Sequence, residues 1–270
     1  DVILQYLAAQ LFVDPSSFSA YGQRAQTRTD HADLVARYLG IRPFRRGDLA
    51  LALNLAAQAA AYTDRGEPIV RALMVGLKGE RFILPSGDTL ERAGLAGRAR
   101  ARKAAAAAIV EGLSSAELTR LDELVINNPD FGMTPLAWLR NFEEAPTAAN
   151  INGLLERLRY VRGIGIHPVV GGAIPEFRFA QFVREGGVAP AFLLSDYSVN
   201  RRRATLTAAV IDLEARLADA AIQMFDRLIG GMFTRARRGR ARRYQDSIQA
   251  RGHRIRLVGA TSTALDEVCQ

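Results

Sequence analysis

The feature that most constrains the fold is a long run of apolar residues at helical spacing between about residues 200 and 233. Side chains of this kind recur every three or four positions along one face, which predicts an amphipathic helix with a core-facing stripe. The stripe consists of Leu206, Val210, Leu213, Leu217, Ala221, Met224 and Leu228. We expect the pair Gly230-Gly231 to kink or end this helix.

The same helical periodicity dominates the rest of the chain, and strand-like alternation is scarce. We therefore predict an all-α fold. A length of 270 residues with 49% hydrophobic residues allows two ordinary domains, each with a core. The stretch NNPDFGMTP at 127–135 collects turn-forming residues and is the best linker candidate. The prediction is one helical domain over 1–129 and another over 130–270, with the long helix at about 200–233 and a basic segment at 235–256.

Local signals place several helix ends. Asp30 is expected to start a helix that Gly40 stops, and Asp48 to cap the next one. Ser114, followed three residues later by a glutamate, forms a capping box. Thr134 precedes a proline, which is the usual N-cap and first-turn pair.

The charge balance is strongly basic and rests on arginine. The chain has 36 basic and 28 acidic residues, a net charge of +8, and only two of the basic residues are lysines, Lys78 and Lys103. Residues 130–270 hold 20 basic and 14 acidic residues, and so carry +6 of that charge. The planar donor fork of arginine suits phosphates and guanine edges. A GC-rich genome explains arginine richness equally well, so composition alone leaves both readings open.

No catalytic pattern stands out. The single cysteine, Cys269, excludes a disulfide within the chain and a Cys/His zinc cluster. His31, His167 and His253 are isolated from each other and lie in no known catalytic motif. The glycine-rich stretch at 163–172 lacks the lysine and hydroxyl residue of a phosphate-binding P-loop. We therefore expect no catalysis, no metal site, no cofactor and no small-molecule substrate in this chain.

No apolar run reaches the length needed to span a membrane, and no signal-peptide pattern is present. The expectation is a soluble cytoplasmic chain without a membrane partner. Because the sequence begins at Asp1 without an initiator methionine, we read it as a piece of a longer protein.

Basic residues cluster after Glu91, and no further acidic residue appears before Glu111. Two of these cations are four residues apart and share a helix face. A cationic stripe on a long helix after a turn is the layout of a DNA recognition helix, although a solvated face is the alternative. The cluster consists of Arg92, Arg98, Arg100, Arg102 and Lys103.

Two other clusters lie near helix ends. Arginines at the turns around residues 30–39 suit phosphate positioning, or are ordinary surface residues; they are Arg24, Arg28, Arg42, Arg45 and Arg46. Arg201, Arg202 and Arg203 begin the long helix, where cations oppose the helix dipole. Something must compensate them, and a phosphate backbone is one candidate.

The last cluster follows the long apolar stripe. A solvated face normally mixes charges of both signs, whereas no acidic residue stands between Asp226 and Asp246. This pattern favours a polyanionic partner. The run contains Arg235, Arg237, Arg238, Arg240, Arg242 and Arg243.

Four stretches together resemble the N-terminal region of the replicative class II transposases, the Tn-three family. The most specific is RRRATLTAAVIDLEARLADAAIQMFDRLIGGMFTRARR at 201–238. YGQRAQTRTDHADLVARYLGIRPF at 21–44, ILPSGDTLERAGLAGRARA at 83–101 and LAWLRNFEEAPTAANINGLLERLRYVRGIGI at 136–166 follow the family pattern in the same order and with matching spacings.

The resemblance implies a helical region, with helix-turn-helix-like elements, that binds double-stranded DNA at the terminal inverted repeats of a transposon in a bacterial nucleoid. The family's acidic triad, which uses Mg²⁺ in an RNase H-like domain of the DDE type, belongs to a part of the protein beyond Gln270. On this basis we expect Arg92, Arg98 and Arg102 to read bases. The run from Arg235 to Arg243 is expected to position the DNA backbone.

One alternative stays open. The chain is then a helical dimerisation or regulatory module of the transposition complex, with only non-specific affinity for DNA. In that case the stripe at 204–233 is an interface between molecules instead of a core face. An independent enzyme is disfavoured by the missing catalytic pattern.

Overall fold

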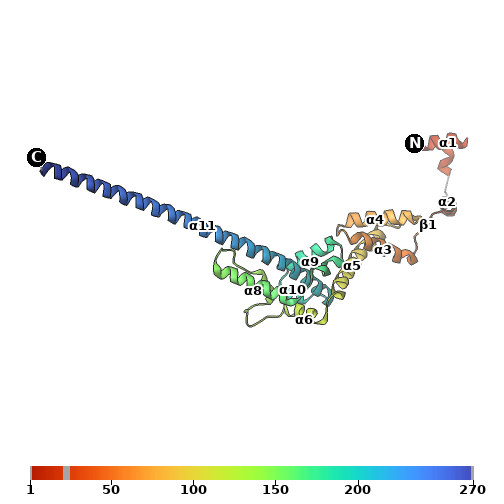
Figure 1. Cartoon of the computed structure of the whole chain (residues 1–270). Helices are drawn as coiled ribbons and strands as arrows, with labels where there is room; N and C mark the ends of the chain where they lie inside the picture. The colour runs from red at the N-terminus through yellow and green to blue at the C-terminus, as the bar shows by residue number, and fades with distance from the viewer. Residues whose placement is uncertain (1, 21–24, 269–270) are drawn as a thin grey trace. The chain divides into compact units, whose positions relative to one another are not determined.

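A computed structural model describes residues 2–20 and 25–268, and most of these residues are helical (Figure 1). The predicted all-α class is confirmed. In chain order the elements are α1 (Val2–Leu11), η1 (Pro15–Ala20), α2 (Ala25–Leu39), β1 (Arg42–Pro43), η2 (Arg46–Asp48), α3 (Leu49–Ala60), α4 (Gly66–Gly79), β2 (Phe82–Ile83), α5 (Gly87–Glu111), α6 (Ser115–Glu123), α7 (Pro135–Arg140), α8 (Ala148–Ile164), η3 (Pro168–Ala173), α9 (Glu176–Val188), α10 (Ala191–Ser195) and α11 (Val199–Val268).

The chain divides into two compact units, residues 1–105 and 106–270, and the division falls within α5. The predicted boundary at 129/130 does not coincide with it. Residues 127–135 instead connect α6 and α7 inside the second unit, where the amide of Leu136 donates to the carbonyl of Leu124 at 3.0 Å. Phe131 from this loop stacks on Trp138 with ring centroids 4.4 Å apart. Turn-forming residues therefore mark a loop that folds back on one core.

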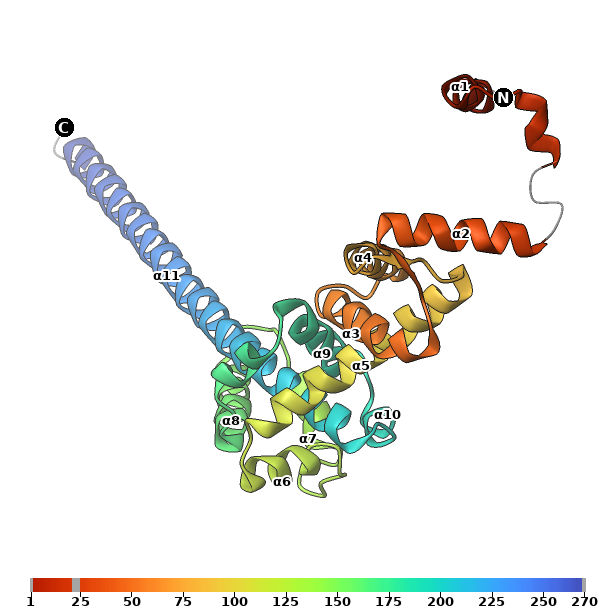
Figure 2. The same ribbon diagram turned by 90° about the vertical axis from the view of Figure 1, so that its right-hand side faces the viewer.

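In the first unit, α3 and α4 pack side by side, and α5 contributes to the same core (Figure 2). The helices meet closely because small residues stand at the contacts. A Cβ atom at Gly97 of α5 would fall inside van der Waals contact with Ala56 of α3. The two-residue strands β1 and β2 pair in parallel, with Arg42 opposite Phe82. The buried core residues are Ala52, Ala56, Ala60, Ile69, Leu73, Leu77, Phe82, Leu90, Ala93 and Ala101.

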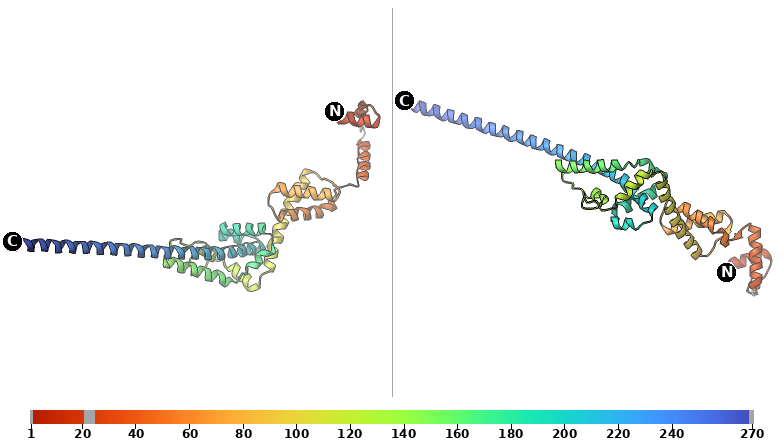
Figure 3. Two further views of the ribbon diagram at one scale, coloured as in Figure 1. Left: turned by 45° about the horizontal axis from the view of Figure 1, so that its top comes forward. Right: turned by 90° about the horizontal axis from the view of Figure 1, so that it is seen from below.

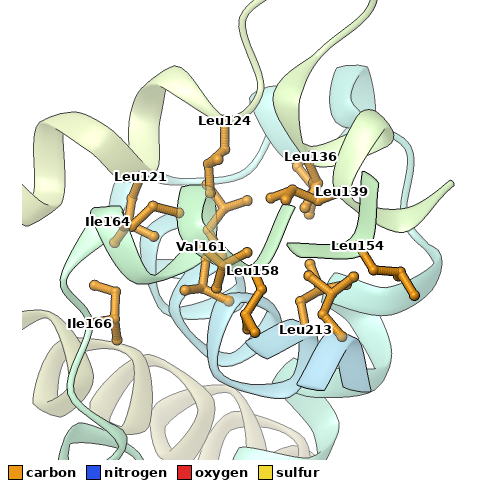
Figure 4. Close-up of a cluster of buried hydrophobic side chains, with 14 of the residues drawn as sticks. Leu121, Leu124, Leu136, Leu139, Leu154, Leu158, Val161, Ile164, Ile166 and Leu213 are labelled. Carbon is orange, nitrogen blue, oxygen red and sulfur yellow. The ribbon is translucent and has the colours of Figure 1, made fainter. Parts of the chain in front are cut away.

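In the second unit, the first part of α11 packs against α8 and α9, and α6 and α7 complete the core (Figure 4). The predicted stripe is a core face as far as Met224, which is buried, whereas Leu228 is only half-buried. Gly186 of α9 lets that helix approach the backbone of Thr205. The interpretation of the stripe as a core face is therefore confirmed from Leu206 to Met224, but it is wrong for the end of the predicted helix, where Met232 and Phe233 are exposed.

The prediction that Gly230-Gly231 ends or kinks the long helix is wrong, because α11 continues as helix through Val268 (Figure 3). Its 70 residues correspond to about 105 Å at about 1.5 Å per residue. Each helical glycine costs about 1 kcal/mol relative to alanine. Methionine, alanine and arginine around the pair are good helix formers, so the local cost does not break the helix.

Three predicted helix ends are confirmed. Gly40 follows α2 with a positive φ of 64°, a conformation that favours glycine. Ser114 and Glu117 form the predicted capping box, and the Thr134 hydroxyl accepts a hydrogen bond from the amide of Ala137.

Two predicted starts are wrong. Helix α2 begins at Ala25 rather than at Asp30. Asp48 makes no side-chain cap for α3, because its carboxylate accepts a 2.8 Å hydrogen bond from the amide of Arg45 instead. An aspartate that faces an amide three residues earlier stabilises the preceding turn in place of the next helix.

Candidate nucleic-acid interface

The arginines after the core form an exposed helical segment of α11, which we call the α11 arginine segment: Arg235, Arg237, Arg238, Arg240, Arg242 and Arg243. Among the described residues, no carboxylate pairs with any of them. Arg243 donates only to the carbonyl of Gly239, one turn earlier, at 3.3 Å. Positions 235, 238 and 242 share one helix face, while 240 and 243 lie on another. The segment therefore presents positive charge on several sides.

The arginines that begin α11 are held internally instead. Arg203 makes two hydrogen bonds to Oδ2 of Asp122, at 2.7 and 3.1 Å, and Arg202 binds Oδ1 of the same carboxylate at 3.2 Å. Arg201 binds Oε1 of Glu185 at 2.8 Å and lies 3.7 Å from the ring centre of Tyr197. The compensation predicted at this helix start is thus supplied by carboxylates of the same unit, and no phosphate is required.

Asp122 shows the strength of this pairing. Partial burial by itself raises the pKa of a carboxyl group. Hydrogen bonds and charges from Arg203 and Arg202 outweigh the burial and hold the pKa of Asp122 below its ordinary value. Asp122 is therefore an ionised partner of both arginines at neutral pH.

Four of the five cations in the α5 cluster divide into two pairs. Arg98 donates to the carbonyl of Asp64 at 3.3 Å, and Arg102 forms an ion pair with the carboxylate of Asp64. Arg98 also lines an apolar groove of about 670 Å³ between α4 and α5. In contrast, Arg100 and Lys103 are exposed, and neither contacts a partner within the part of the chain that the structure describes.

Arg92 belongs to neither pair, because it lies exposed at the start of the helix and makes long contacts of 3.2 and 3.4 Å to Asp88. An exposed pair of this kind contributes little to stability. Arg92 can therefore exchange its carboxylate for another anion at low cost.

The N-terminal cluster is also mixed. Arg24 lies outside the described residues. Arg28 on α2 and Arg46 on η2 are exposed, as is Arg45, which directly precedes η2. Arg42 is held by Asp48 at 3.0 Å, and its guanidinium lies 3.9 Å from the ring centre of Phe82.

Sequence reasoning missed a group of structural arginines that bind the carboxyl ends of helices. Arg120 donates to the carbonyls of Gly163 and Ile164, at 3.2 and 3.1 Å, at the end of α8. Arg140 donates to the carbonyls of Gly186 and Ala189 at the end of α9, and burial lowers its pKa. The partners are more than 40 residues apart in sequence, so no local pattern signals them.

Within residues 2–20 and 25–268, no three histidine, cysteine, aspartate or glutamate side chains are grouped as metal ligands. None of the helices described there has an apolar stretch long enough to cross a bilayer.

Comparison with known proteins identifies a family model and several transposases that are similar to this chain. A family model described as a domain of unknown function, DUF4158, matches residues 1–96. The transposase for transposon Tn3926 of Escherichia coli is 32% identical over 99% of the chain. Over nearly its whole length the chain is therefore similar to part of a Tn-three family transposase.

Two further relatives match at comparable identity. The transposase for transposon Tn21 of Escherichia coli is 30% identical over 99% of the chain. The transposase for transposon Tn501 of Pseudomonas aeruginosa is 29% identical over 98% of it. In all three cases the chain spans only 27% of the relative's length. The similarity therefore covers both units but about a quarter of each transposase.

Proposed function

We propose that this part of the transposase binds double-stranded DNA and recognises the terminal inverted repeats of its transposon. The observation that carries the proposal is the α11 arginine segment, which is exposed and has no carboxylate partner among the described residues. Because the charges of these arginines are not compensated by carboxylates, the segment favours an anionic partner. The phosphates of the DNA ends on which a transposase acts are such a partner.

The dimensions of the segment suit this role. Residues 235–243 span about 12 Å along the helix axis at about 1.5 Å per residue. The major groove of B-DNA is about 12 Å wide and is bordered by phosphates on both sides. Because the arginines lie on more than one face, the segment can contact both borders, which fixes position without reading sequence.

Strand chemistry is proposed to reside in the remaining length of the transposase. The resemblance implies an acidic, Mg²⁺-dependent site of the DDE type, and the described carboxylates of this chain form no such cluster. We therefore assign no step of the reaction to the residues of this span.

Fluorescence anisotropy tests the proposal. The chain is titrated against a duplex with the terminal repeat of its own transposon and against a scrambled duplex, over a salt series. We expect tighter binding to the repeat that persists as salt rises. Equal binding to both duplexes that collapses with salt would refute recognition of the repeat.

A matched pair of triple variants isolates the α11 arginine segment. Replacing Arg235, Arg238 and Arg242 by alanine should reduce the slope of log K against log salt by about 2.7, at about 0.9 per phosphate contact. The control removes three exposed arginines elsewhere in the second unit, Arg159, Arg184 and Arg227, and should leave the slope unchanged.

A second candidate function rests on a different observation. Beyond the core, α11 exposes apolar side chains, among them Phe225 and Phe233, which are 54% and 69% exposed. In this reading the exposed apolar side chains after Met224, and not the buried stripe from Leu206 to Met224, serve as a dimerisation surface. Sedimentation of the DNA-free chain decides: a tight dimer favours the interaction module, and a monomer removes it.

A further inference from the structure

We propose that the exposed face of α5 enters a groove of the DNA and that Arg100 is the side chain on this face that reads base edges. We call this surface the α5 open face and define it by Ala96, Ala99, Arg100 and Lys103. The inference rests on the proposed function and names the residue that gives it specificity.

Helix geometry separates the α5 open face from the rest of the cluster. At about 100° per residue, Arg100 lies about 160° around the helix from Arg98 and about 160° from Arg102. Arg98 and Arg102 face Asp64, which lies in the connection between α3 and α4. Reading bases with either of them would break contacts that hold α5 to the first unit, whereas Arg100 makes no such contact within the described chain.

The shape of the α5 open face permits close approach. Its members Ala96 and Ala99 are exposed, and the neighbouring Ala104 is exposed as well. Alanine adds only a methyl group to the helix surface, so the backbone can lie deep in a groove while Arg100 reaches beyond it. No acidic residue stands between Glu91 and Glu111, so the face does not repel phosphates.

The chemistry then distinguishes the two cations of this face. An arginine presents two parallel N–H groups that match O6 and N7 of guanine, the commonest specific contact in the major groove. A lysine is a compact point charge without that fork. We therefore assign guanine recognition to Arg100 and a phosphate contact to Lys103.

Selection from a randomised duplex library tests the assignment, because the library contains every short binding site. The wild-type chain is expected to enrich a motif that contains at least one strongly preferred guanine. Arg100→Ala and Arg100→Lys should both lose that preference, by roughly 5- to 150-fold for the best base against the others. Arg100→Lys retains the charge and should keep the wild-type salt slope.

Two controls complete the design. Lys103→Ala should keep the motif while its affinity for all sequences falls and the salt slope drops by about 0.9. Arg102→Ala removes the same charge two residues from Arg100, and should keep the motif while lowering the thermal midpoint of the first unit. Circular dichroism shows whether each variant is folded; Arg100 is exposed, so its variants are expected to match the wild type.

The outcomes separate this inference from the proposed function. A wild-type chain that enriches no motif overturns both. A wild-type motif that survives unchanged in Arg100→Ala overturns only the role of Arg100. Loss of the guanine preference in Arg102→Ala, with Arg100→Ala unaffected, would return base reading to the opposite face of α5.

Discussion

Replacement of Asp122 by asparagine tests whether the arginines at the start of α11 are structural. The carboxylate is 27% exposed, and the side chains of Arg202 and Arg203 are 19% and 25% exposed, so solvent screens the pair only partly. Hydrogen bonds to charged groups are worth about 1.5–3 kcal/mol, and breaking a buried ion pair costs about 3–5 kcal/mol. Since this cluster is only partly buried, we expect Asp122→Asn to lower the free energy of unfolding by about 2–3 kcal/mol.

Urea denaturation followed by circular dichroism measures the loss. Asp196→Asn is the matched control, because it makes the same chemical change at an exposed site after α10 and should stay within about 0.5 kcal/mol of the wild type. A loss for Asp122→Asn that is no larger than the control's would refute the internal pairing and restore phosphate as the compensating group.

The pH dependence of this difference is fixed in sign. The folded-state pKa of Asp122 lies below its ordinary value, so its contribution is full above the unfolded-state pKa of about 3.9 and is lost as pH falls through the folded-state pKa. The wild type and Asp122→Asn should therefore differ most above about pH 5 and converge in acid. A difference that grows as the solution is acidified would contradict the assignment.

Glycine substitutions test two features of the fold. Gly97→Ala should destabilise the first unit by about 1–3 kcal/mol, because the added methyl group collides with Ala56, whereas Gly87→Ala meets open space and should not. Thermal unfolding that is the same for both variants would contradict the close packing of α5 on α3. Replacing Gly230 and Gly231 by alanine should stabilise α11 by about 1 kcal/mol each, visible as a stronger helical signal in circular dichroism on heating, since nothing lies within 4 Å of either added methyl group. An unchanged signal would show that α11 does not run as helix through this pair.

The fold was predictable where a pattern repeats along one element. The buried stripe from Leu206 to Met224 follows from spacing alone, as does the capping box at Ser114. The continuation of α11 past Gly230 was not predictable, because helix propensity summed over many residues outweighs two local breakers. The predicted boundary at 129/130 also differs from the division within α5, since a turn-rich loop at 127–135 looks the same in sequence whether it joins two domains or two helices of one core.

The candidate site was predictable as a list of cations but not as a surface. Asp122 and Arg203 are 81 residues apart, and Asp64 and Arg102 are 38 apart. No local window contains both members of either pair. Sequence therefore shows where arginines are numerous, and the tertiary fold decides which of them already have a carboxylate.

That distinction matters for binding. A paired arginine such as Arg102 must give up its carboxylate before it can take a phosphate, so the exchange replaces one charge-assisted hydrogen bond by another. An arginine such as Arg238 has no carboxylate to give up. When such an arginine neutralises a phosphate, counterions are released from the DNA, and that release is the main driving force for non-specific binding. If the proposed function holds, the unpaired cations of α11 and of the α5 open face are therefore the ones that supply the binding energy. The paired ones hold the helices that present them.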